Sequence, residues 1–119
     1  MANIIVVDDS FYMRTMLKHI LVDAGHTVIA EAPNAESAIR LIREKSPDIV
    51  TLDVILPDNT GLDVLKAIKG LEPAPKVIMV SAVGQNLIVD EAISLGAIDY
   101  IVKPFSEEKV KATLDKILA

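Results

Sequence analysis

Five polar residues of this 119-residue chain stand directly after apolar runs, at positions where buried strands are expected to end. They are Asp8, Asp9, Asp53, Ser81 and Lys103. In open α/β sheets, ligands bind outside the carboxyl ends of the strands, where the strand order reverses. We therefore expect carboxylates, a hydroxyl and an ammonium group to meet in one pocket.

The charges of such a pocket limit its chemistry. Three adjacent carboxylates repel one another unless a cation joins them, and an all-oxygen ligand set suits Mg²⁺. A carboxylate can also be the nucleophile that forms an aspartyl phosphate. The ammonium of Lys103 is suited to a phosphoryl oxygen, and together with a metal ion it would neutralise the charge that develops during phosphoryl transfer.

A framework of alternating strands and helices is needed to position these residues. Apolar runs predict strands at Ile4 to Val7, Thr27 to Glu31, Ile49 to Leu52, Lys76 to Val80 and Asp99 to Val102. A helix is predicted after each strand, with N-caps at Ser10, Asn34 and Ser106. Strands joined by crossover helices imply an α/β fold, a (βα)5 doubly wound parallel sheet covered on both faces.

The periodicity of the last two helices predicts which side chains face the core. In the fourth helix we expect a buried stripe of Val89, Ala92 and Ile93. Leu87 shares its face with acidic residues and is expected to be exposed. In the fifth helix the predicted apolar stripe is Val110, Leu114, Ile117 and Leu118.

Composition argues against several classes of function. The net charge of −5 does not favour a nucleic-acid binder, whose affinity rests on basic side chains. The chain has no cysteine, so it offers no disulfide and no thiolate metal site. The first residues, MANIIVVDDS, lack the basic start of a signal peptide, and no apolar run is long enough to cross a membrane. We expect one cytoplasmic domain over residues 1–119, without an attached output domain.

Four motifs carry a resemblance to a known family. VVDDS, LDVILPDNTG, VSAVGQ and YIVKPF follow one another along the chain, each at a predicted strand end. With these motifs the chain resembles the receiver domains of two-component response regulators, most closely the stand-alone chemotaxis regulators of the CheY type. The resemblance implies a flavodoxin-like sheet of order 2-1-3-4-5 and a switch controlled by phosphorylation.

The resemblance also implies the roles of the acidic residues. Asp53 matches the phosphoacceptor and is a metal ligand as well. Asp9 matches the direct ligand of Mg²⁺, and Asp8 acts mainly through water. The backbone carbonyl of Ile55 completes the metal site, so the type of its side chain matters little there.

For the remaining matching residues, the resemblance implies roles in catalysis and in switching. Ser81 and Lys103 match the residues that contact the new phosphoryl oxygens, and the bond before Pro104 matches a cis peptide. Tyr100 matches an aromatic residue that swings inward when the Ser81 hydroxyl moves. Leu87 and Tyr100, with the last helix, are expected to form the surface that changes on phosphorylation, although an isolated exposed leucine is also common in proteins.

These roles imply partners. A histidine kinase would donate the phosphoryl group, and a motor component or another downstream protein would bind the phosphorylated form. We expect a monomer that binds no nucleic acid, does not insert into a membrane, and catalyses only its own phosphoryl transfer and dephosphorylation.

Alternative functions are weighed by the residues that they would need. A Mg²⁺-dependent phosphatase with an aspartyl-phosphate intermediate would need a second aspartate where Ile55 stands. A flavin-binding module would need a phosphate-binding loop where Asp8 and Asp9 would repel phosphate. A stand-alone phosphorelay intermediate would have the same site and differ only in its partner, so this alternative stays open. Taken singly, each site residue is also explained as a helix cap, a turn residue or a solvated side chain.

Overall fold

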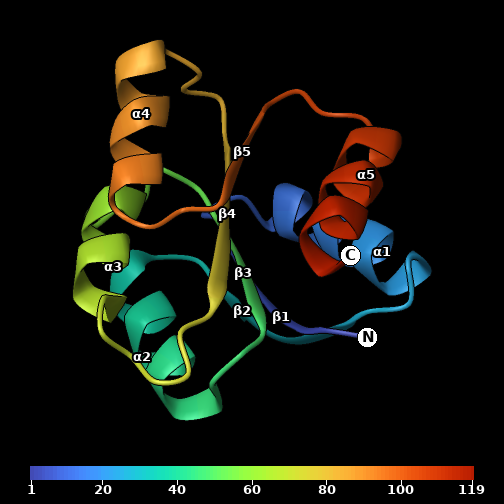
Figure 1. The fold of residues 1–119 in the computed structure, drawn as a ribbon, viewed down its shortest axis with the longest axis horizontal. Coiled ribbons are helices and arrows are strands. Elements are labelled where there is room, and N and C mark those ends of the chain that lie inside the picture. The colour runs from blue at the N-terminus through green and yellow to red at the C-terminus, as the bar shows by residue number, and fades with distance from the viewer.

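The computed structural model describes residues 1–119 as five strands alternating with five helices (Figure 1). The strands are β1 (Asn3–Val7), β2 (Thr27–Ala32), β3 (Ile49–Leu52), β4 (Lys76–Ser81) and β5 (Asp99–Val102). The helices are α1 (Phe11–Asp23), α2 (Ala35–Lys45), α3 (Gly61–Ile68), α4 (Asn86–Ser94) and α5 (Glu107–Leu118). None of these helices combines the length and the apolar character that crossing a membrane requires.

All five strands are parallel and lie in the order β2-β1-β3-β4-β5. Helices α1 and α5 cover one face of the sheet, and α2, α3 and α4 cover the other (Figure 1). The strand order reverses between β1 and β3, which are direct neighbours. The predicted flavodoxin-like (βα)5 fold is confirmed, and its ligand-binding edge is where the carboxyl ends of these two strands lie.

The sheet separates two hydrophobic clusters, one on each face. In β1, Ile5 and Val7 belong to one cluster, and Ile4 and Val6 belong to the other, because successive strand residues point to opposite faces. All four side chains are buried, as expected for a central parallel strand. The strands that lead into the site are thus packed from both sides.

Helix starts differ in how well they are capped. The side chains of Ser10, Asn34 and Ser106 each accept a hydrogen bond from a backbone N–H in the first turn, at 3.2, 2.8 and 3.1 Å. These three predicted N-caps are confirmed, and Thr60 caps α3 in the same way at 3.2 Å. The N-cap residue of α4, Gln85, makes no such side-chain bond. Helix α4 is therefore the one whose start depends least on local side-chain hydrogen bonds.

The predicted inner face of α4 is confirmed only at Ala92, because Val89 is half-buried and is not among the residues that pack against the core. Ile93 is 45 % exposed, and the residues that pack against the core are Ile88, Ala92 and Leu95. Successive helix residues are about 100° apart around the axis, so a stripe through 88, 92 and 95 turns Ile93 toward solvent. The exposure of Leu87 was predicted correctly, since 83 % of it is accessible.

The predicted stripe of α5 is correct except at its end. Val110 and Leu114 are buried, and Ile117 packs partly against the same cluster. Leu118 is 42 % exposed, because it is the last residue of the helix and lies beyond the packed part of that cluster.

Candidate functional site

The structure brings the predicted site residues to one edge of the sheet. Asp8 follows β1, Asp53 follows β3, Lys103 follows β5, and Ser81 is the last residue of β4. One carboxylate oxygen from each of Asp8, Asp9 and Asp53 lies within 4.8 Å of the others. Strands that are far apart in sequence thus deliver a compact acidic cluster, called the acidic site below.

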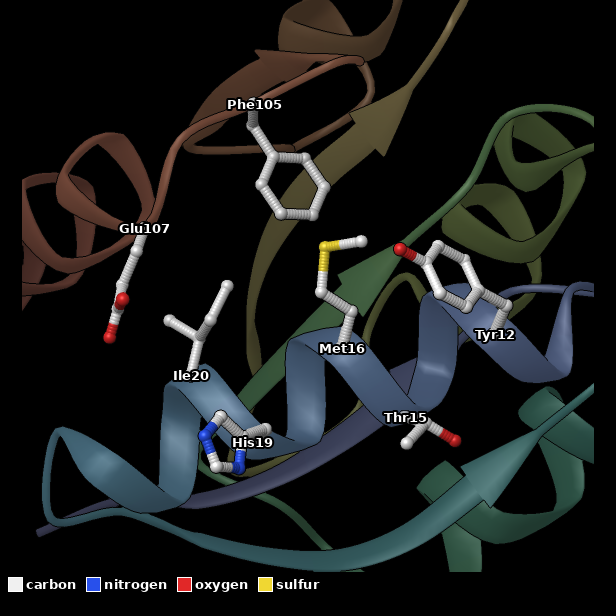
Figure 2. A pocket seen from close by; sticks show the side chains of 7 residues that line it. All are labelled: Tyr12, Thr15, Met16, His19, Ile20, Phe105 and Glu107. Carbon is white, nitrogen blue, oxygen red and sulfur yellow. The ribbon is translucent and has the colours of Figure 1, made fainter.

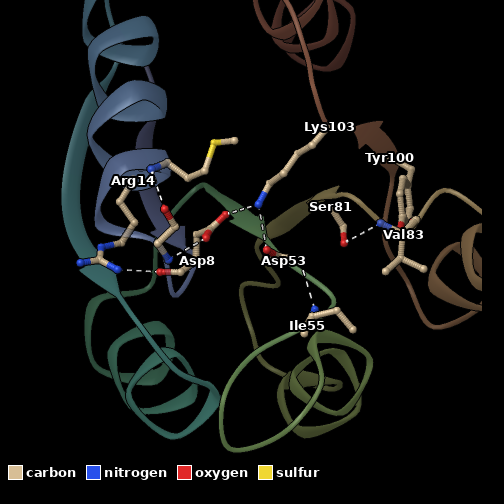
Figure 3. A network of polar contacts seen from close by, with 10 residues as sticks. Asp8, Arg14, Asp53, Ile55, Ser81, Val83, Tyr100 and Lys103 are labelled. Atoms are coloured by element: carbon tan, nitrogen blue, oxygen red, sulfur yellow. Dashed lines mark hydrogen bonds and ion pairs between the residues drawn. The ribbon is translucent and has the colours of Figure 1, made fainter.

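Lys103 binds two of these carboxylates. Its Nζ lies 2.6 Å from Oδ2 of Asp8 and 2.9 Å from Oδ2 of Asp53 (Figure 3). Burial alone would lower the pKa of Lys103, but the hydrogen bonds to Asp8 and Asp53 outweigh it and raise the pKa above its usual value. The ammonium group therefore stays charged and offsets part of the negative charge. The contact with Asp53 agrees with the expected role, whereas the contact with Asp8 was not predicted.

The two adjacent aspartates have different surroundings. Asp8 is buried, and its Oδ1 accepts a hydrogen bond from the Ser10 N–H at 2.9 Å while Oδ2 binds Lys103. The backbone carbonyl of Asp8 accepts a third bond, from Arg14 at 2.7 Å. Asp9 is exposed and its carboxylate makes no hydrogen bond to the protein. Of the pair, Asp9 is thus the one with free oxygens for an ion.

Asp53 is held through both its main chain and its side chain. Its N–H donates to the carbonyl of Val7 at 3.1 Å, and its Oδ1 accepts from the Ile55 N–H at 3.2 Å. A Cβ on Gly61 would run into the carbonyl oxygen of Asp53, so only glycine permits this close approach. The side chain of Ile55 is 58 % exposed and points away from the core. Asp53 is therefore fixed by β1, by its own loop and by the start of α3.

The loop after Asp53 is also attached to α2. Oδ1 of Asp58 accepts from the Ala35 N–H at 2.8 Å, and Oδ2 accepts from the Glu36 N–H at 3.0 Å. These backbone hydrogen bonds lower the pKa of Asp58 below its usual value. Sequence analysis placed Asp58 only in a turn. Nothing in the local pattern shows that its carboxylate caps a helix more than twenty residues earlier.

Ser81 and Tyr100 meet at the backbone of Val83. The buried Oγ of Ser81 accepts from the Val83 N–H at 3.3 Å, and the Tyr100 hydroxyl donates to the Val83 carbonyl (Figure 3). Burial raises the pKa of the Tyr100 phenol, the nearby Ser81 hydroxyl opposes that rise, and the charge of Asp53 adds to it. The two predicted switch residues are thus linked through the backbone of one residue, Val83, beside the acidic site.

A separate pocket lies between α1 and the residues around the start of α5 (Figure 2). Its volume is about 470 Å³, and it is lined by Tyr12, Thr15, Met16, His19, Ile20, Phe105 and Glu107. None of these residues belongs to the acidic site, and no cluster of charged groups converges in the pocket. The chemistry predicted from the sequence is located at the sheet edge and not in this pocket.

Comparison with known proteins agrees with this geometry. Residues 4–115 match the model of the response regulator receiver domain. The chemotaxis protein CheY of Listeria monocytogenes is 46 % identical over 98 % of this chain and 98 % of its own length. CheY of Thermotoga maritima is 44 % identical over 97 % of this chain and 96 % of its own.

Solved structures show the same relationship. The CheX–CheY–BeF3–Mg²⁺ complex of Borrelia burgdorferi contains a chain that superposes with a TM-score of 0.94 and 31 % identity, covering 98 % of this chain and 89 % of that one. The family model and the curated relatives both extend over nearly all of the sequence. The chain therefore belongs to the family of response regulator receiver domains, and its function is phosphorylation-dependent signalling in a two-component system.

Proposed function

We propose that this protein is a cytoplasmic, stand-alone chemotaxis regulator, a single receiver domain over residues 1–119 that accepts a phosphoryl group on Asp53 from a histidine kinase. The observation that carries the proposal is the position of the Lys103 ammonium, 2.6 Å from Asp8 and 2.9 Å from Asp53, beside the free carboxylate of Asp9. Its kinship with CheY proteins supports chemotaxis as the process.

The acidic site fits Mg²⁺. Its donors are carboxylate oxygens from three residues within 4.8 Å of one another, the ligand type that Mg²⁺ prefers. Asp9, Asp53 and the Ile55 carbonyl would hold the ion, with Asp8 acting through water. Bound Mg²⁺ supplies positive charge that offsets the negative charge of the transferring phosphoryl group.

Residues of this chain supply the nucleophile and the groups that bind the transferred phosphoryl group. A carboxylate oxygen of Asp53 attacks the phosphorus of the kinase phosphohistidine, so an O–P bond forms while the N–P bond breaks. The Lys103 ammonium and the Ser81 hydroxyl bind oxygens of the new phosphoryl group. Because Ile55 stands where a phosphatase of this chemistry would need its general acid, the protein acts as a switch and not as an enzyme for other phosphate esters.

The change at Asp53 reaches the surface through Ser81 and Tyr100. To donate to a phosphoryl oxygen on Asp53, the Ser81 hydroxyl turns toward it and leaves the Val83 N–H, from which its oxygen accepts at 3.3 Å. The Tyr100 hydroxyl donates to the backbone carbonyl of Val83, so the position of the ring depends on where the Val83 backbone lies. Phosphorylation shifts the population between two existing arrangements of α4, β5 and α5.

The output surface includes Leu87 and Tyr100. Leu87 is 83 % exposed on α4, and Tyr100 lies on β5 with its hydroxyl reaching the loop before α4. Tyrosine is enriched among the residues that contribute most to protein–protein binding, and an exposed leucine beside it adds apolar area that a partner can bury. We assign this face to a motor component or another downstream protein that binds the phosphorylated monomer.

Labelling with a small phosphodonor tests the proposal. The native protein is incubated with acetyl phosphate with and without Mg²⁺, and its intact mass is measured alongside Asp53→Asn. We expect a gain of one phosphoryl group that requires Mg²⁺ and is absent in Asp53→Asn. Asp115→Asn, at an exposed aspartate of α5, is the matched control and should be labelled normally. Equal labelling of Asp53→Asn would refute the assignment of the phosphoacceptor.

A further inference from the structure

Arg14 lies against the acidic site although no motif pointed to it. It extends from the first turns of α1 and its side chain is only 14 % exposed. Its Nη1 donates to the backbone carbonyl of Asp8 at 2.7 Å (Figure 3). Its Nε binds Oε1 of Glu31 on β2 at 3.2 Å. The guanidinium carbon lies 5.7 Å from the ring centroid of Phe11. The guanidinium group of Arg14 is thus nearly buried, and one of its two polar partners is a main-chain oxygen of the acidic site.

The hydrogen bond from Arg14 to the Asp8 carbonyl also affects the position of Asp9. The peptide between Asp8 and Asp9 is planar, so fixing its carbonyl oxygen also fixes the direction in which the Asp9 backbone leaves. The Asp9 carboxylate makes no hydrogen bond of its own. Its position therefore depends on this peptide, and the peptide is held from the side by Arg14.

The other polar groups of Asp8 are already engaged. Its N–H donates to the Ala32 carbonyl at 3.1 Å, Oδ1 accepts from the Ser10 N–H, and Oδ2 binds Lys103. These contacts hold the Asp8 side chain and its N–H, but none of them holds the carbonyl. Arg14 is the group that completes the set of partners around this residue.

Glu31 orients the guanidinium group. Arginine presents several donors in a rigid planar fork, so pairing Nε with Glu31 determines where Nη1 points. The Nζ of Lys18 lies 3.8 Å from the other Glu31 oxygen and neutralises part of the same carboxylate. A lysine at position 14 has a single head group, which cannot hold both the carboxylate and the carbonyl with the same geometry.

We infer that Arg14 is a positioning residue for the cation site: through the Asp8 carbonyl it holds the Asp8–Asp9 peptide so that the Asp9 carboxylate faces the ion. This inference rests on the proposed function of the acidic site as a Mg²⁺ site. The competing explanation is that Arg14 only ties α1 to β2, which would affect stability and leave the affinity for Mg²⁺ unchanged.

Calorimetric titration of the full chain with Mg²⁺ separates these explanations. Outer partners of metal ligands typically contribute tenfold or more to affinity, so we expect Arg14→Met to bind Mg²⁺ about tenfold more weakly. Arg14→Lys should recover part of the loss. Glu31→Gln should weaken binding less than Arg14→Met does, and the double variant should be no weaker than Arg14→Met, because the pair acts as a unit.

Arg43→Met is the matched control. Arg43 also donates to a backbone carbonyl, that of Ala67 at 3.0 Å, but it joins α2 to α3 away from the site. We expect this variant to bind Mg²⁺ like the native protein. Urea denaturation is measured in parallel so that affinities are compared only between folded chains, and Arg14→Lys and Glu31→Gln carry the test if Arg14→Met does not fold.

The outcomes are distinguishable. If the native protein does not bind Mg²⁺, the proposed function fails. If the native protein binds Mg²⁺ and the folded Arg14 and Glu31 variants bind it equally well, the proposed function stands and the positioning role is overturned.

Discussion

The acidic site and the face made by α4 and β5 lie at the two ends of the link through Ser81, Val83 and Tyr100, and they are built in opposite ways. In the acidic site, Asp8 is 1 % exposed and Asp53 is 6 % exposed, and both are bound by the same ammonium. Along α4 and β5, by contrast, apolar side chains stand in solvent: Leu87, Ile93 and Val102 are each more than 40 % exposed.

The two regions also differ in how their backbones are held. The strand ends and loops of the acidic site are fixed by bonds from several other elements, including α2 and α3. Helix α4 begins without a side-chain cap and buries only one residue fully, Ala92. A rigid site keeps charged groups in place for chemistry, whereas a loosely held element can change its arrangement at low free-energy cost. The contrast predicts where substitutions will alter stability and where they will alter only binding.

Removing the ammonium group from the acidic site should have the largest effect on stability. Lys103→Met leaves two buried carboxylates without their counter-charge, and we expect the free energy of unfolding to fall by about 3 kcal/mol in the absence of divalent ions. Added Mg²⁺ should restore stability in the variant more than in the native protein. Urea denaturation with EDTA and with Mg²⁺ measures both effects. An unchanged unfolding curve would show that the charges are not coupled.

Gly61→Ala acts on the same region through the backbone. The new methyl group would collide with the carbonyl of Asp53, so the loop has to move, and we expect a loss of about 2 kcal/mol in the free energy of unfolding. The shift should also weaken Mg²⁺ binding. Gly70→Ala, at a surface turn with open space around it, is not a neutral control because its φ of +90° disfavours alanine.

Gln85→Ser tests whether the start of α4 is loosely held. It would give α4 the side-chain cap that the remaining helices have, and we expect the free energy of unfolding to rise by about 0.5–1 kcal/mol. Hydrogen exchange of the α4 amides should slow. Unchanged exchange would indicate that the start of α4 is already held by its tertiary contacts.

Leu87→Asp should change stability least, by no more than about 0.5 kcal/mol, because the side chain is 83 % exposed. Its effect should be confined to the affinity of the phosphorylated protein for its downstream partner. Binding is measured with the beryllofluoride-loaded protein and the candidate motor component. Unaltered affinity would remove Leu87 from the proposed partner surface, and a large loss of stability would contradict the contrast between the two regions.

The strands were predictable because central parallel strands are continuous apolar runs. The central strand Ile49 to Leu52 was predicted with the bounds that the structure has, and so was the edge strand Asp99 to Val102. The acidic site followed from them, because the topology of the sheet brings strand ends together. The inner face of α4 was harder to predict, since Leu87, Ile88 and Val89 are all apolar and periodicity alone does not decide between neighbouring stripes.

Arg14 and Asp58 could not be predicted for a different reason. Both act on main-chain groups, the Asp8 carbonyl in one case and the first N–H groups of α2 in the other. A backbone group carries no residue-type signal, so no pattern in the sequence marks such a partner. Contacts of this kind are visible only once the chain is folded.

The two contacts of Lys103 also have a consequence for how the chain is made. They span 95 and 50 residues, so the aspartates are synthesised long before the lysine that balances them. A nascent chain that has not yet released β5 from the ribosome holds two carboxylates with no counter-charge and has no ammonium to meet an incoming phosphate. The acidic site thus acquires its balancing charge last, when the final strand joins the sheet.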